Sequence, residues 1–280
     1  MTRERTVLIT GASTGIGEAC ARRLDLAGWR VFAGVRTPDA GELLRAGTSS
    51  RLEPVLLDVT DDEQVADLGR SLDERLGPNG LDGLVNNAGI GVGGPIEYVP
   101  IEVLRQQLEV NVIGPVRMVQ AAREPLRRAH GRIAMIGSIA GRISSPVLGP
   151  YASSKHALAA LTESLRSELH GAGIRVALIE PGAVATPIWD KASEQAAGVR
   201  ESLPPVGRAR YDTILDKVEQ NLLSSAAHAV PADRVATAVE HALTRRWPKS
   251  RYLVGPDARI AATLLRVLPD RARAAMALRI

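Results

Sequence analysis

The sequence contains little of what a secreted, membrane-spanning or nucleic-acid-binding protein needs. Its single cysteine, Cys20, excludes an internal disulfide and lies in an apolar helical pattern typical of a small core residue. Aromatic residues make up only 3% of the chain, and no basic block interleaves with them, which argues against nucleic-acid binding at a formal charge of +4. No uncharged run approaches the roughly 20 residues of a spanning helix, and the N-terminus lacks a secretory signal. We therefore expect a cytoplasmic protein without a nucleic-acid partner, and we predict no metal site.

Apolar segments typical of β-strands alternate with amphipathic helical patterns along the 280 residues. The strands are mostly apolar on both faces, as expected for a parallel sheet covered by helices on each side. Right-handed crossovers then predict a single α/β domain, with a Rossmann-type, doubly wound parallel sheet of about seven strands flanked by helices. A capping box at Thr60–Glu63 is expected to start the third helix. The predicted strands are Thr6–Thr10, Arg30–Val35, Glu53–Asp58, Gly83–Asn86, Arg132–Gly137, Ile174–Glu180 and Arg251–Val254.

A glycine-rich segment, Thr10–Gly17, follows the first strand and opens the first helix. Its glycines permit a tight turn and let backbone N–H groups approach a pyrophosphate, and the helix N-terminus adds a favourable dipole. An ordinary strand-to-helix turn can look the same, but here the preceding strand, the helix and a second strand all fall where a dinucleotide site needs them. We therefore predict a dinucleotide at Gly11, Ser13, Thr14, Gly15, Ile16 and Gly17.

Tyr151 and Lys155 lie four residues apart in a predicted helix, and therefore on one face of it. Free tyrosine titrates near roughly 10, and a neighbouring cation lowers that pKa, which suits the phenol to proton transfer. Ser138, just beyond the fifth strand, offers a hydroxyl that can hold a substrate oxygen. Alone, a Tyr-x-x-x-Lys pair usually lies on a solvent-exposed helix face without a function, and Ser138 would be an ordinary loop hydroxyl. Together, behind a glycine loop, they predict transfer of a hydride between a nicotinamide and a secondary alcohol or ketone, with Tyr151 as general acid and base.

The glycine spacing G-x-x-x-G-x-G resembles the classical short-chain dehydrogenase/reductase family, and the resemblance extends from Thr6 to about Thr186. Residues Gly141–Leu158 are more weakly similar to steroid and retinol dehydrogenases of that family. Further landmarks of the family appear in order: Asp58-Val59, Asn86-Asn87-Ala88-Gly89, Asn111, Ser138, Tyr151-Ala152-Ser153-Ser154-Lys155, Pro181-Gly182 and Thr186.

The resemblance implies a role for each landmark. Asn111 would interrupt its helix and hold a water in a proton relay to Lys155, which would also bind the nicotinamide ribose. The catalytic residues would be Asn111, Ser138, Tyr151 and Lys155. The cofactor would further contact Asp58 and Val59 at the adenine, Asn87, Ala88 and Gly89 in the middle of its groove, and Pro181, Gly182, Val184 and Thr186 at the nicotinamide.

The end of the second strand indicates the choice of cofactor. An acidic residue there would bind both ribose hydroxyls of NAD and repel a 2′-phosphate. This chain has Val35 at that place, followed by Arg36, whose guanidinium can form two charge-assisted bonds to a phosphate. A solvated surface arginine is the alternative. We expect NADP(H) to be favoured over NAD(H).

Three segments should surround the substrate: Ile90–Pro95, Arg142–Pro150 and a lid at residues 187–230. The lid would divide the domain into a cofactor-binding and catalytic core, 1–186, and a last helix, strand and tail, 231–280. Arg142 is the only basic residue in the first two segments, and the rest is small or apolar. A lipophilic substrate is therefore expected. The expected substrate contacts are Val92, Ser138, Val147, Leu148, Tyr151, Ile188 and Trp189.

Two other functions fit the same motifs. A 3-ketoacyl-thioester reductase would keep the chemistry and change the substrate, and a catalytically idle NADP(H)-binding sensor or scaffold would keep only the binding. A homodimer or homotetramer is expected from the family and from the leucine-rich helix Tyr151–Leu169 and the helix before it, which pair across subunits in relatives. The alternative is that Leu158, Leu161, Leu165 and Leu169 face their own sheet. The Arg-rich tail from Pro256 is expected to pack on the core, with contact to a membrane surface as the alternative.

Overall fold

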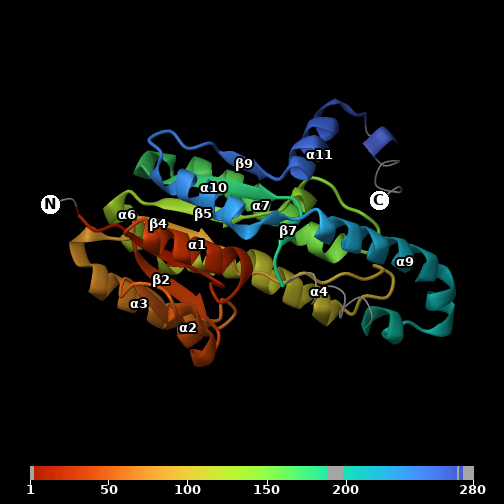
Figure 1. Cartoon of the computed structure of the whole chain (residues 1–280), viewed down its shortest axis with the longest axis horizontal. Coiled ribbons are helices and arrows are strands. Elements are labelled where there is room, and N and C mark those ends of the chain that lie inside the picture. Colours follow the sequence, from red (N-terminus) through yellow and green to blue (C-terminus); the bar gives the residue numbers. More distant parts are fainter. Residues whose placement is uncertain (1–2, 188–197, 270, 274–280) are drawn as a thin grey trace.

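The computed structural model describes residues 3–187, 198–269 and 271–273. Its centre is a parallel sheet of seven strands in the order β3-β2-β1-β4-β5-β6-β9, which confirms the predicted doubly wound architecture (Figure 1). The strands are β1 Thr6–Ile9, β2 Arg30–Val35, β3 Leu52–Leu56, β4 Gly83–Asn86, β5 Arg132–Ile136, β6 Arg175–Pro181 and β9 Arg251–Val254.

Helices cover both faces of the sheet because alternate strand residues point to opposite sides. Val7 and Ile9 face one hydrophobic cluster with helices α1 and α10, whereas Leu8 between them faces a second cluster with α3, α5, α6 and α7. The helices are α1 Gly15–Leu26, α2 Pro38–Arg45, α3 Asp62–Leu76, α4 Ile101–Leu108, α5 Gly114–Ala121, α6 Arg123–Ala129, α7 Gly149–Glu168, α9 Pro205–Ala227, α10 Ala232–Thr244 and α11 Pro256–Val267. Within the described ranges, none of them is long and apolar enough to span a bilayer.

The strand order reverses at the centre of the sheet, where β1 lies between β2 and β4. The carboxyl ends of parallel strands share one edge, so the segments after β1, β4, β5 and β6 meet there. The part of the lid that the structure describes lies toward this end, where α9 extends away from the sheet (Figure 1). A short parallel pair, β7 Val184–Ala185 and β8 Val230–Pro231, joins the two ends of the lid. The division into core, lid and tail remains a prediction.

Three local expectations are refined by the structure. The third helix starts one residue later than predicted, because the carboxylate of Asp61, rather than Thr60, accepts the amides of Glu63 and Gln64. Cys20 is fully buried, and burial raises the pKa of its thiol to about 12, which fits a core residue. The tail forms α11, which buries one face at Ala258, Ala262 and Leu265 and leaves Ile260 and Val267 exposed.

The leucine stripe of α7 does not lie as the oligomer argument requires. Leu158 is buried in the second hydrophobic cluster, between α7 and the sheet. Leu165 and Leu169 are partly buried and pack against that cluster. Leu161 is half-buried and belongs to neither hydrophobic cluster, so three of the four leucines face their own sheet, as the alternative predicted. The homo-oligomer therefore stays a prediction that rests on family resemblance alone.

Candidate active site

The glycine loop between β1 and α1 is shaped for close approach. Gly11 and Gly15 have φ angles of +62° and +61°, in a backbone region that residues other than glycine rarely adopt. A Cβ on Gly17 would overlap the carbonyl oxygen of Gly11, so the loop closes only with glycine there. Thr14 caps α1 without a side-chain hydrogen bond to the first turn, so its side chain does not satisfy the amides at the N-terminus of the helix. The loop thus fits a pyrophosphate.

The segment after β4 braces this loop. The side-chain amide of Asn87 donates to the carbonyls of Thr10 and Gly11 at 3.0 and 2.9 Å. The Thr10 hydroxyl in turn accepts the amides of Asn87 and Ala88 at 3.0 and 2.9 Å. Asn87 therefore shapes the glycine loop from behind, a structural task that its predicted place in the groove did not specify.

The segment after β6 completes the predicted dinucleotide surface. A Cβ placed on Gly15 would lie 3.0 Å from Cγ2 of Thr186, so the two predicted cofactor residues face each other. Asp257 of α11 accepts the Ala183 amide at 2.7 Å and lies against Gly182. Pro181 and Val184 are buried. Three of the strand ends named in the sequence therefore meet at one place.

Arg36 and Asp58 lie near each other at the ends of β2 and β3. Burial alone would raise the pKa of Asp58, but hydrogen bonds from Thr60 and the charge of Arg36 outweigh it and lower that pKa. Both bonds to Asp58 come from Thr60, at 2.9 Å from its amide and 2.7 Å from its hydroxyl. Arg36 is exposed and makes no side-chain hydrogen bond or ion pair within the described chain. Val59 is buried against Gly114.

Tyr151, Lys155 and Ser138 come together as predicted. The Lys155 ammonium lies 5.7 Å from the centroid of the Tyr151 ring, is buried, and donates to the Ile136 carbonyl at 3.0 Å. The Ser138 hydroxyl lies close enough to the Tyr151 phenol to lower its pKa. Its oxygen also accepts the Ala140 amide at 3.1 Å, which caps the turn η3, Ile139–Gly141.

The pKa of Tyr151 shifts in the direction opposite to the one expected from its lysine neighbour. Burial raises it, and the hydrogen bond from Ser138 opposes the shift without cancelling it. Burial also lowers the pKa of Lys155 to about 8, because the site disfavours the protonated form of this side chain. A charge 5.7 Å from the ring does not offset the loss of solvent around the phenol.

Asn111 lies in a π-helical turn, η2 Glu109–Ile113, between α4 and α5. The predicted break in the helical ladder is therefore present. Its side chain is buried, accepts the Ile90 amide at 2.9 Å and donates to the Ile90 carbonyl at 2.8 Å and the Ser154 hydroxyl at 3.0 Å. A Cβ on Gly89 would lie 3.3 Å from its oxygen and 3.8 Å from the Lys155 nitrogen, which places Asn111 near Lys155.

Gln107 is a site residue that the sequence analysis missed. It is fully buried and holds the same segment as Asn111, donating to the Ile90 carbonyl and accepting the Val92 amide, both at 2.6 Å. The available signal was its place one helical turn before Asn111. A glutamine in an amphipathic helix is normally solvated, so that signal alone carries little weight.

The two predicted substrate segments are joined by their backbones. The Gly94 amide donates to the Val147 carbonyl at 2.7 Å, and Gly93 approaches both Val147 and Leu148. Val147 adopts a φ of +68°, a strained conformation for a β-branched residue. Arg142 forms an ion pair with Glu180, so it does not offer a free cation to an acidic substrate. Ile188 and Trp189 lie outside the described residues.

The sequence matches known proteins over nearly its whole length. Residues 5–197 match the family model described as short chain dehydrogenase. 17-beta-hydroxysteroid dehydrogenase type 6 of Bos taurus is 38% identical over 276 residues, 95% of this chain and 86% of that protein. NADPH-dependent 3-dehydrocapnine reductase of Ornithobacterium rhinotracheale is 34% identical, covering 95% and 94%. Retinol dehydrogenase 5 of Mus musculus is 36% identical, covering 95% and 85%.

Solved structures agree with these relatives. A short-chain dehydrogenase from Streptomyces avermitilis superposes with a TM-score of 0.80 at 27% identity, covering 99% of this chain and 96% of that one. One from Burkholderia cenocepacia in complex with NADP gives 0.73 at 26%, covering 96% and 95%. One from Burkholderia phymatum in complex with NAD gives 0.76 at 27%, covering 94% and 92%. The chain therefore belongs to the short-chain dehydrogenase family and is an NAD(P)-binding oxidoreductase.

Proposed function

We propose that this protein interconverts a lipophilic secondary alcohol and its ketone with NADP(H), and that Tyr151 transfers the proton. The observation that carries the proposal is the buried Lys155 ammonium, held by the Ile136 carbonyl 5.7 Å from the centroid of the Tyr151 ring, with the Ser138 hydroxyl beside the phenol. In reduction, the raised pKa of Tyr151 keeps the phenol protonated at neutral pH and ready to donate to the substrate oxygen. Ser138 holds the same oxygen. In oxidation, the alcohol proton passes to the Tyr151 phenolate, a form that the Ser138 hydroxyl favours and burial opposes. The bound nicotinamide supplies or accepts the hydride at the carbonyl carbon.

The cofactor preference is proposed from Arg36. Its exposed, unpaired guanidinium next to Asp58 suits a 2′-phosphate, and no acidic residue occupies the end of β2. We expect Arg36→Ala to raise KM for NADPH by roughly ten- to a hundredfold, since charge-assisted bonds contribute about 1.5–3 kcal/mol, and to leave KM for NADH nearly unchanged. Steady-state kinetics with both cofactors measure this. Arg45→Ala, which removes an exposed arginine from the far end of α2, is the control. Equal use of NADH and NADPH by the wild type would refute the proposed preference.

The substrate class is proposed from the apolar character of the two joined segments and of Val92, Val147 and Leu148 within them. The relatives are named for steroid and retinol dehydrogenases, which supports a lipophilic carbonyl compound. Each added buried methylene contributes about 0.8 kcal/mol, so kcat/KM should rise by up to severalfold per carbon along a series of methyl ketones until the site is full. The measurement is NADPH oxidation with ketones of increasing chain length.

Other results of the same assay decide between the alternatives. A flat or falling trend with chain length, or a preference for a charged or polyhydroxylated carbonyl, contradicts the lipophilic substrate class. Preferential turnover of an acetoacetyl thioester identifies a 3-ketoacyl-thioester reductase. Tight NADPH binding without turnover of any carbonyl tested identifies an idle sensor or scaffold.

A further inference from the structure

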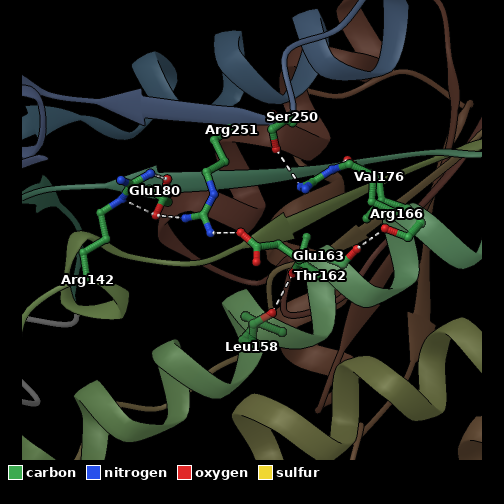
Figure 2. Close-up of polar contacts among 10 residues, drawn as sticks. Arg142, Leu158, Thr162, Glu163, Arg166, Val176, Glu180, Ser250 and Arg251 are labelled. Atoms are coloured by element: carbon green, nitrogen blue, oxygen red, sulfur yellow. Dashed lines mark hydrogen bonds and ion pairs between the residues drawn. The ribbon is translucent and has the colours of Figure 1, made fainter. Parts of the chain in front are cut away.

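Two arginines and two glutamates form a network of ion pairs between α7, β6, β9 and the segment after η3 (Figure 2). Its centre is Glu180, which is fully buried at the carboxyl end of β6. Arg142 donates to both carboxylate oxygens, through Nε at 2.8 Å and Nη2 at 2.7 Å, and Arg251 of β9 donates to Oε1 at 2.8 Å. Arg251 also pairs with Glu163 of α7. Two guanidinium groups and two carboxylates balance, and the proton transfer proposed above uses none of them.

The arm through Arg142 leads directly to Ser138. Arg142 follows η3, the short turn that Ser138 caps, and its amide bonds the Ile139 carbonyl at 2.9 Å. The turn lies tightly on α7, because a Cβ on Gly141 would lie 2.8 Å from the carbonyl oxygen of Lys155. Glu180 therefore holds, through Arg142, one end of the turn whose other end carries Ser138, the residue beside the Tyr151 phenol.

Arg251 links β9 to α7 and β6, and other hydrogen bonds also hold these elements together. Arg166 of α7 donates to the carbonyls of Val176 in β6 and Ser250 before β9, each at 2.9 Å. Helix α7 thus stays on β6 without Glu163 or Arg251. Ahead of Ser138, the Gly137 amide donates to the Ile179 carbonyl of β6 at 2.7 Å. Beyond the turn, the bonds from Arg142 to Glu180 are the side-chain bonds that hold it to β6 among the described residues.

A bidentate pair to a buried carboxylate is directional, and breaking it leaves a charge without its partner. We propose that Glu180 is a positioning residue, which acts through Arg142 to hold the η3 turn so that Ser138 stays within hydrogen-bonding reach of Tyr151 and the substrate oxygen. This inference rests on the proposed function. It adds that the rate of proton transfer depends on an ion pair that touches neither substrate nor cofactor.

The experiment compares single-turnover rates of ketone reduction with NADPH bound. We expect Glu180→Gln and Arg142→Met each to lower the rate at saturating ketone by about tenfold or more, as a misplaced group does, with KM for the ketone and the Kd of NADPH within about threefold of wild type. Arg142→Lys should recover part of the loss, because it restores the charge but not the two-point bond. In a Ser138→Ala background, Glu180→Gln should add less than about twofold, since the hydroxyl it positions is already gone.

Two control variants separate positioning from general stability. Arg251→Met removes the other cation from the same carboxylate, and Glu53→Gln alters a carboxylate that likewise lies between two arginines, Arg30 and Arg75, at the opposite edge of the sheet. Both should lower the unfolding midpoint yet keep the single-turnover rate within about threefold of wild type.

Three outcomes would overturn the inference. They are wild-type rates in Arg142→Met, equal rate losses in Arg142→Met and Arg251→Met, and full additivity of Glu180→Gln with Ser138→Ala. If Glu180→Gln does not fold, the two Arg142 variants and their combination with Ser138→Ala decide alone. Failure of the proposed function is seen separately, as turnover that survives Tyr151→Phe.

Discussion

Tyr151→Phe should lower the rate of carbonyl reduction by 10²–10⁴-fold, the typical effect of losing a positioned acid–base group. The ring would remain beside Lys155, and only the hydroxyl next to Ser138 would be lost. NADPH affinity should therefore stay within about threefold of wild type. Single-turnover reduction and a fluorescence titration of NADPH measure the two quantities.

Tyr252→Phe is the matched control for this variant. The Tyr252 hydroxyl bonds the Lys249 amide at 3.0 Å and the His241 ring at 2.8 Å, at the edge of the sheet beside β9. Its loss should lower stability and spare the rate. A Tyr151→Phe enzyme with rates within about a factor of three of wild type would remove Tyr151 from the mechanism.

Lys155→Met should abolish most turnover, by at least about a hundredfold, and at the same time stabilise the fold. Burial lowers the pKa of Lys155 from 10.5 to about 8, so the folded protein binds fewer protons than the unfolded chain between these pH values. Below pH 8 the lysine is charged in both states, and the full cost of burying the ammonium applies. Wild-type stability should consequently rise with pH across this window, because the unfolded state binds more protons there.

The gain from Lys155→Met should thus be largest at neutral pH, at about 1–3 kcal/mol after allowing for the lost bond to Ile136, and should shrink above pH 8. Denaturant unfolding of both proteins at pH 7 and pH 9.5 measures the difference. A variant that is destabilised to the same extent at both pH values would show that the buried ammonium carries no such cost.

The fold was predictable because its signals are local and repeated. Most strands are apolar on both faces, the crossover helices are amphipathic, and the glycine loop lies between the first strand and the first helix. The approximate strand ends followed from the same patterns. The start of α3 was wrong by one residue because Thr60 and Asp61 are both good caps, and only the packing of the chain decides which one is used.

The polar contacts inside the site were less accessible from the sequence. Gln107 lies one helical turn before Asn111, and both side chains bond the backbone of Ile90. Nothing in the sequence around Gln107 distinguishes a buried glutamine from a solvated one. Arg142 and Glu180 are 38 residues apart in sequence, and their pairing depends on the turn of η3. The sign of the Tyr151 shift was wrong because charge proximity can be inferred from spacing, whereas the loss of solvent around a side chain cannot.

The hydrogen bond from the Gly94 amide to the Val147 carbonyl joins the two substrate segments through main-chain atoms only. Gln107 likewise grips backbone groups of residues 90 and 92. These hydrogen bonds hold the two segments through main-chain atoms, so they do not depend on which side chains stand at positions such as Val92 and Leu148. Substitutions at these predicted substrate contacts should therefore leave the main-chain support in place. On our proposal, the substrate range can change through single substitutions on an unchanged scaffold.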